Sequence, residues 1–215
     1  KATNVGGITG NNSGNVQNVT VRNGSLNLNG LTANADIVNL GGAVGTNSGE
    51  VNTANVTLDV TDNLGKYVNL GGVVGSNSGT LDQCTYQGVL GTADTNNAGN
   101  IINGATNTGD TVGGIVGLNG GKVTGCTVAS ITLQVQGASA LSDSRTTEQK
   151  LSSASHVGGI AGQNKGTVES SYVAATANGG SIITARFGFV GGIAGSNSGS
   201  ITNSGAQGAF TANGG

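Results

Sequence analysis

Side chains able to act as catalytic bases or metal ligands are few in this chain, and they are widely separated. His156 is the only histidine in 215 residues. Neither a pair of histidine ligands nor a His-Glu-x-x-His zinc motif can therefore form from the chain alone. His156 precedes Val157, at a repeat position filled elsewhere by Asn4, Asn39, Asn69, Thr111 and Phe189. A position that accepts these residue types indicates a corner of the chain path rather than a catalytic base.

The acidic residues form no obvious catalytic pair. Sugar-cleaving enzymes use two neighbouring carboxyl groups. Asp59 and Asp62 are close in the sequence, whereas Asp36, Asp82, Asp94, Asp110 and Glu169 are isolated. The pattern of a calcium-binding loop is also missing. We therefore expect no catalytic residue, no metal ion and no cofactor, and a polysaccharide-cleaving enzyme is the least favoured function.

The elements that must position these side chains are six copies of one pattern, close to [V/L]-G-G-[I/V/A]-[V/A/T]-G-x-N-x-G-x-[V/I/L]. The copies cover residues 5–16, 40–51, 70–81, 112–123, 157–168 and 190–201. Their glycine pairs are Gly6-Gly7, Gly41-Gly42, Gly71-Gly72, Gly113-Gly114, Gly158-Gly159 and Gly191-Gly192. Their asparagines are Asn12, Asn47, Asn77, Asn119, Asn164 and Asn197. A constant block separated by spacers of variable length is typical of stacked repeats.

Each block predicts two short strands around a tight turn. The apolar Val-Gly-Gly-Ile-x-Gly segment predicts the first strand, Asn-x-Gly the turn, and the following apolar residue the start of a second strand. Spacers often hold a third alternating stretch, such as residues 56–60. Three strands in about 30 residues correspond to one turn of a β-solenoid. We therefore predict an all-β, single-domain parallel β-solenoid (β-helix) of about six coils over residues 1–215.

Stacking the coils about 4.8 Å apart would align equivalent side chains in columns. Ile8, Ala43, Val73, Ile115, Ile160 and Ile193 would form one inward column. The six asparagines would form another, with their amides hydrogen-bonded along the axis. We interpret that column as structural, with a row of ligand-binding amides as the alternative.

Cys84 and Cys126 occupy equivalent positions in adjacent blocks, where the other blocks have Val19, Ala54, Ser171 and Ser204. The coil spacing of about 4.8 Å is compatible with a disulfide. Stacked parallel neighbours, however, point their Cβ atoms in the same direction, which favours two reduced cysteines in an inward column.

Composition restricts the partners. Only 8% of the residues are charged, and the eight Lys and Arg residues are scattered. We therefore expect no nucleic-acid partner. No apolar stretch approaches the ~20 residues of a membrane span, so we expect no membrane insertion. The lack of methionine suggests a processed chain or a fragment of a longer array.

The blocks resemble the GLUG motif, a glycine-rich repeat of bacterial surface and secreted proteins, including the immunoglobulin A1-cleaving zinc peptidases of streptococci. The resemblance lies in the G-G-[I/V/A]-x-G-x-N-x-G core. It implies an extracellular or cell-surface location, here without a peptidase domain.

These features favour a non-enzymatic stalk, adhesin segment or scaffold that binds host or extracellular-matrix surface molecules. The alternative is a subunit of an extracellular fibre that binds itself end to end through open solenoid ends. The spacer that holds Asp143, Arg145, Glu148 and Lys150 concentrates charge. We predict that it protrudes as a contact loop.

Overall fold

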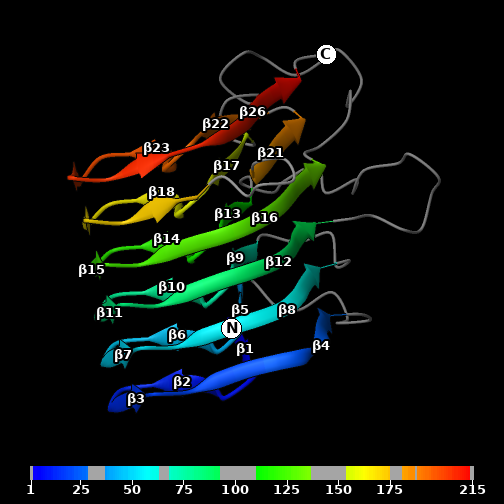
Figure 1. The fold of residues 1–215 in the computed structure, drawn as a ribbon. Coiled ribbons are helices and arrows are strands. Elements are labelled where there is room, and N and C mark those ends of the chain that lie inside the picture. Colours follow the sequence, from blue (N-terminus) through cyan, green and yellow to red (C-terminus); the bar gives the residue numbers. More distant parts are fainter. Residues whose placement is uncertain are drawn as a thin grey trace.

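The computed structural model describes residues 2–28, 37–62, 68–92, 110–136, 154–174, 181–186 and 188–213. Within these ranges the chain forms strands joined by turns and bends, with no helix. The strands belong to six coils that stack along one axis, with the first coil at one end and the last at the other (Figure 1). The predicted parallel β-solenoid of about six coils is confirmed.

Every coil passes through four sheets in the same order, and we number the coils 1 to 6 from the N-terminus. Coil 1 contains β1 (Ala2–Gly6), β2 (Thr9–Asn12), β3 (Asn15–Gln17) and β4 (Thr20–Leu28). Coil 2 contains β5 (Ile37–Gly41), β6 (Val44–Asn47), β7 (Glu50–Asn52) and β8 (Asn55–Asp62). Coil 3 contains β9 (Val68–Gly71), β10 (Val74–Asn77), β11 (Thr80–Asp82) and β12 (Thr85–Thr92).

The later coils repeat this order. Coil 4 contains β13 (Thr111–Gly113), β14 (Val116–Asn119), β15 (Lys122–Thr124) and β16 (Thr127–Gln136). Coil 5 contains β17 (Ser155–Gly158), β18 (Ala161–Asn164), β19 (Thr167–Glu169), β20 (Tyr172–Val173) and β21 (Ser181–Arg186). Coil 6 contains β22 (Gly188–Gly191), β23 (Ala194–Asn197), β24 (Ser200–Thr202), β25 (Gly205–Ala206) and β26 (Gly208–Asn213). In these two coils the fourth side is divided into two strands.

All pairings between coils are parallel, and equivalent residues face one another. Gly6 pairs with Gly41 in the first sheet, and Asn77 pairs with Asn47 and Asn119 in the second. The predicted alignment of glycine pairs and asparagine turns along one axis is therefore confirmed.

The prediction of three strands per coil is wrong, because the first predicted strand is two strands. In coil 2 the chain bends at Gly42 and Ala43, between β5 and β6. The third glycine of each block lets the strand of the second sheet pack closely against the strand of the first sheet. A Cβ atom on Gly117 would lie 2.6 Å from the backbone nitrogen of Leu70 in β9. The first two sheets thus lie backbone against backbone, which a larger residue would prevent.

The core is the space enclosed by the stacked coils. Ala43, Val73, Ile115 and Ile160 of the predicted inward column are completely buried. At the ends of that column Ile8 is 46% exposed and Ile193 is only partly buried. Position along the axis therefore decides how deeply equivalent residues are buried, since an end coil has a neighbour on one side.

One residue between the third and fourth sheets has a left-handed backbone in every coil. These residues are Asn18, Thr53, Gln83, Gly125, Ser170 and Asn203, with φ between 48° and 61°. Left-handed geometry normally favours glycine or asparagine. Thr53, Gln83 and Ser170 adopt it because the continuous stack fixes the corner in every coil.

We predict that Gly114→Ala destabilises the chain strongly. The new Cβ would lie 2.1 Å from the carbonyl oxygen of Gly159 and 2.7 Å from Cγ2 of Val128, so the coils would have to separate locally. We expect a loss of at least about 3 kcal/mol in urea unfolding. The control is Gly120→Ser, because a Cβ on Gly120 meets no atom closer than 3.5 Å and Ser48 and Ser78 occupy the same place. Equal unfolding midpoints for the two variants would contradict close packing at the glycine pair.

Candidate functional site

The column of turn asparagines is the most continuous polar feature of the described chain. In coils 1 to 5, Nδ2 of the turn asparagine donates to Oδ1 of the asparagine in the next coil. From Asn12 to Asn197 the five distances are 2.8, 2.8, 2.9, 2.8 and 2.7 Å. The direction is the same at every step, from the coil nearer the N-terminus to the next.

Each amide also closes its own turn. Within its turn, Nδ2 of Asn119 donates to the carbonyl oxygen of Gly121 over 3.3 Å, and Oδ1 accepts from the N–H of Gly121. Nδ2 also donates to the carbonyl oxygen of Thr167 in coil 5 over 3.2 Å. Asn47, Asn119 and Asn164 are completely buried. Because their hydrogen-bonding groups are used within the fold, these asparagines form a structural column rather than a row of ligand-binding amides.

A second polar column lies in the first sheet, and sequence reasoning missed it. Nδ2 of Asn39 donates to Asn4 over 2.8 Å, and Nδ2 of Asn69 donates to Asn39 over 2.7 Å. The hydroxyl of Thr111 continues the column by donating to Asn69. The donors here point toward the N-terminal coil, opposite to the turn asparagines. The available signal was the asparagine that precedes the Val or Leu of each of the first three blocks.

His156 continues this second column and is not at a corner, which corrects the sequence-based expectation. It lies within β17, paired with Thr111 on one side and Phe189 on the other. Its ring stacks on Phe189 with the ring centroids 5.3 Å apart and the planes 14° from parallel. Nδ1 is buried without a hydrogen-bond partner among the described residues. Burial, assisted by the charge of Lys165, lowers the pKa of His156.

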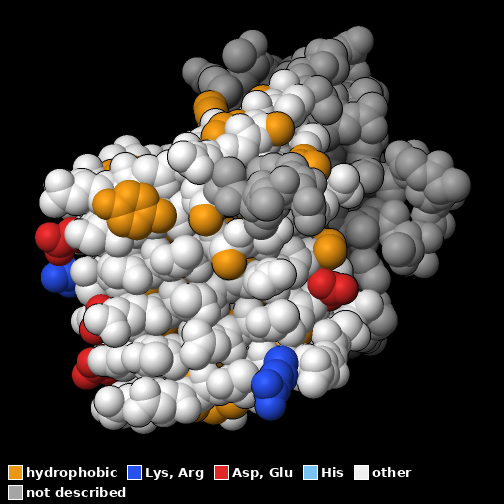
Figure 2. Space-filling view, viewed as in Figure 1, with side chains coloured by type: hydrophobic (Ala, Val, Ile, Leu, Met, Phe, Trp, Pro, Cys, Tyr) orange, Lys and Arg blue, Asp and Glu red, His pale blue; other side chains and the backbone are white. Residues whose placement is uncertain are grey.

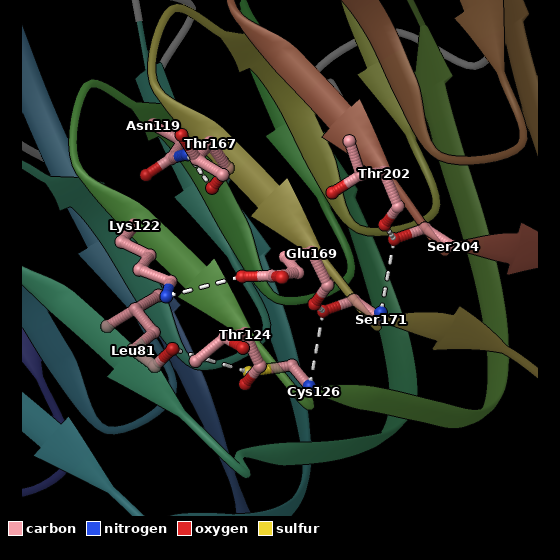
Figure 3. A network of polar contacts seen from close by, with 10 residues as sticks. All are labelled: Leu81, Asn119, Lys122, Thr124, Cys126, Thr167, Glu169, Ser171, Thr202 and Ser204. Atoms are coloured by element: carbon pink, nitrogen blue, oxygen red, sulfur yellow. Dashed lines mark hydrogen bonds and ion pairs between the residues drawn. The ribbon is translucent and has the colours of Figure 1, made fainter.

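Cys84 and Cys126 are free, buried thiols, as the argument from parallel stacking favoured. They belong to a column in which a backbone N–H of one coil donates to the side chain of the next. Figure 3 shows this column from Cys126 to Ser204. Cys84 N–H donates to Sγ of Cys126, Cys126 N–H to Oγ of Ser171, and Ser171 N–H to Oγ of Ser204. The hydrogen bond with Cys84, together with burial, raises the pKa of the Cys126 thiol. The same hydrogen bond lowers the pKa of the Cys84 thiol. Sγ of Cys84 also donates to Val51 O and Sγ of Cys126 to Leu81 O, each in the preceding coil, so both buried thiols take part in joining the coils.

Charged groups take little part in this architecture. Nζ of Lys122 lies 3.2 Å from a carboxylate oxygen of Glu169 in the next coil, on the surface (Figure 3). The side chains are 49% and 39% exposed, so the ion pair contributes little stability. Within the described ranges, no three His, Cys, Asp or Glu residues are grouped so that they could hold a metal ion. The charged spacer with Asp143, Arg145, Glu148 and Lys150 lies outside those ranges.

A shallow hollow of about 280 Å³ lies on the fourth sheet, near the register shifts of β4 against β8 and of β12 against β16. It is lined by Asn23, Gly24, Thr57, Leu58, Asp59, Gln87 and Gly88. Oδ1 of Asp59 accepts from the N–H of Val89 over 2.9 Å. The hollow therefore offers amides, a hydroxyl and one carboxylate that is already engaged.

Comparison with models of known families, with curated proteins and with solved structures gave no match. The described residues also include no helix long and apolar enough to cross a membrane. The resemblance to GLUG repeats stays a prediction from the sequence.

We predict that Asn119→Ala is much more destabilising than Asn197→Ala. The first change leaves Asn77 Nδ2 and Asn164 Oδ1 without their buried partner, whereas Asn197 is exposed at the end of the column. We expect a loss of about 2–4 kcal/mol for Asn119→Ala and about 1 kcal/mol for Asn197→Ala in urea unfolding. Similar losses for both variants would show that the column contributes no cooperative stability.

Acidification should destabilise the chain through His156. Its folded pKa is lowered, so the unfolded imidazole binds a proton first as the pH falls through the ordinary value of 6.5. The stability that neutral His156 contributes is fully present above pH 6.5. It is lost as the pH falls toward the pKa of His156 in the folded chain. His156→Phe, which keeps a ring beside Phe189, should remove this part of the pH dependence. Urea unfolding of both proteins between about pH 8 and 5 measures it. Parallel stability curves for the two proteins would contradict the assignment.

Proposed function

We propose that this chain is a rigid, non-enzymatic structural segment of an extracellular or cell-surface protein, acting as a stalk or scaffold. The observation that carries the proposal is the unbroken asparagine column, in which each of the six coils is hydrogen-bonded to the next. The four parallel sheets run along the same axis. Bending the rod would stretch these bonds on one side, so a continuous stack resists bending.

The distribution of polar groups also favours a structural role. Asn, Ser and Cys side chains, which could contact ligands elsewhere, are here bound to equivalent residues in adjacent coils. The visible side of the rod is covered mainly by uncharged side chains and backbone, with few acidic or basic groups (Figure 2). We propose that this side surface contacts host or extracellular-matrix surface molecules. The extracellular location rests on the resemblance to GLUG repeats.

The hollow on the fourth sheet does not favour sugar cleavage. Glycoside hydrolysis normally uses two carboxyl groups, one as an acid and the other as a base or nucleophile. Asp59 is the one carboxylate among the residues that line the hollow, and it accepts a backbone N–H. A scaffold therefore accounts for this surface better than an enzyme.

The rigidity of the rod can be tested by measuring the distance between two spin labels, one on coil 1 and one on coil 6, by electron paramagnetic resonance. Spin labels on Ser13 and Ser198 would occupy exposed turns of coils 1 and 6, after Cys84→Ser and Cys126→Ser remove the native thiols. Serine is compatible with that column because Ser171 and Ser204 already occupy it. We expect a distance distribution nearly as narrow as that of a control pair on Ser48 and Ser78 in adjacent coils. A much broader distribution for the end-to-end pair would refute a rigid rod.

Location and lack of catalysis need separate tests. Antibodies raised against the chain should label intact source cells or their medium, and labelling that requires permeabilised cells would refute a surface role.

The purified chain should release no products from bacterial or host polysaccharides. Release that disappears in Asp59→Asn but persists in Asp82→Asn would instead establish an enzyme at the hollow.

A further inference from the structure

Coils 1 and 6, the first and last of the described residues, each pair with a neighbouring coil on one side only, and their other edges are complementary. The four sheets end with β1, β2, β3 and β4 on one side and with β22, β23, β24 and the strands β25 and β26 on the other. In coil 1, Ile8 is 46% exposed and Val5, Val16, Val19, Val21 and Leu26 are partly buried. In coil 6, Val190, Ile193, Ile201 and Ala206 are partly buried and Phe210 is 39% exposed. Hydrophobic side chains are visible at the top of the molecule, over β22 and β26 (Figure 2).

Hydrogen bonding gives the two edges opposite polarity. In coils 1 to 5 the turn asparagine donates Nδ2 to the next coil, but Nδ2 of Asn197 donates only to Gly199 O within its own turn among the described residues. At the other edge, Oδ1 of Asn12 accepts from Gly14 N–H, whereas the Oδ1 of Asn47 accepts from an asparagine of the preceding coil. Coil 6 thus presents a donor where coil 1 presents an acceptor.

Charge does not oppose contact between these edges. Residues 188–213 contain no Asp, Glu, Lys or Arg, and residues 2–28 contain only Arg22. Open sheet edges in soluble proteins are commonly protected by charged residues. The charged residues of the described chain are concentrated in the inner coils, as with Glu50, Lys122 and Glu169.

We propose that a second copy of this chain stacks on coil 6 through its own coil 1, in the parallel register of the inner coils. Asn197 of one copy then donates to Asn12 of the next, and the exposed Ile8 enters the apolar column beside Ile193. Because this contact joins two different surfaces, it repeats in one direction and gives filaments. The inference depends on the coil edges and is independent of the surface location and of any side-surface ligand.

The first test compares Ile8→Lys with Ile182→Lys by sedimentation velocity and electron microscopy. The two isoleucines are 46% and 47% exposed, so neither change should unfold the monomer. Ile8 lies in the end column, whereas Ile182 points outward from β21 between buried neighbours. We expect wild-type chains and Ile182→Lys to form filaments at micromolar concentration, and Ile8→Lys to associate at least tenfold more weakly. A wild type that stays monomeric, or equal effects of the two variants, would overturn the proposal.

The second test examines the direction of stacking through Asn197→Asp. The carboxylate still accepts from Asn164, so coil 6 keeps its own bond, but it presents an acceptor to the acceptor of Asn12 in the next copy. Asn203→Asp adds the same charge to the same coil away from the column and is the control. We expect at least tenfold weaker association for Asn197→Asp and near wild-type filaments for Asn203→Asp. Equal association of Asn197→Asp and wild type would overturn the proposed register.

Mixing the two end variants tests polarity directly. Ile8→Lys keeps an intact coil 6 edge, and Asn197→Asp keeps an intact coil 1 edge. An equimolar mixture should therefore form one-to-one dimers that do not grow further, while each variant by itself stays monomeric. Failure of the mixture to dimerise, with circular dichroism showing both variants folded, would overturn head-to-tail stacking. The rigidity of the monomeric Ile8→Lys chain would still test the scaffold function on its own.

Discussion

The fixed spacing between coils is the constraint on which the rest of this structure depends. Parallel backbone hydrogen bonds hold neighbouring coils at the separation of adjacent β-strands, about 4.8 Å. At that distance each side chain meets the equivalent side chain of the next coil, so a residue is acceptable only if it packs against or hydrogen-bonds the residue at the same position there. Asparagine satisfies this condition because its amide carries both a donor and an acceptor. Glycine satisfies it at the bend because a Cβ atom on Gly42 would lie 2.1 Å from the carbonyl oxygen of Gly72.

The same constraint explains how the columns vary in composition. A column tolerates a change of residue type where the new neighbours interact in another way. In the first sheet, hydrogen-bonded Asn4, Asn39, Asn69 and Thr111 give way to the stacked rings of His156 and Phe189. In the cysteine column, the thiol of Cys126 and the hydroxyls of Ser171 and Ser204 all accept from backbone N–H groups of the preceding coil. Tyr86 is another adaptation, since its buried ring packs against Gly72 and its hydroxyl lies 3.1 Å from Leu58 O. Burial and the charge of Asp59 raise its pKa.

Within the described residues, the inner polar side chains join the coils, and the charged side chains are exposed or half-buried on the outside of the rod. The end coils differ from the inner coils because they contact a neighbour on one side, which leaves apolar residues and hydrogen-bonding groups exposed there. The rigidity and the end-to-end association that we propose would both follow from one repeat geometry, although they depend on different residues and can be tested separately.

The sequence by itself determined the repeat, its register and the solenoid class, because a block that recurs six times reports the geometry that each coil must share. It also predicted the asparagine column and the reduced cysteines, which follow from parallel stacking. It did not reveal that Val-Gly-Gly-Ile-x-Gly forms two strands, since glycine is compatible with both an extended chain and a bend. Nor did it reveal the left-handed corner, where residues as different as Asn18, Thr53 and Gly125 share one conformation. Only the tertiary structure decided these features, because contacts with the coils on both sides impose them on the local chain.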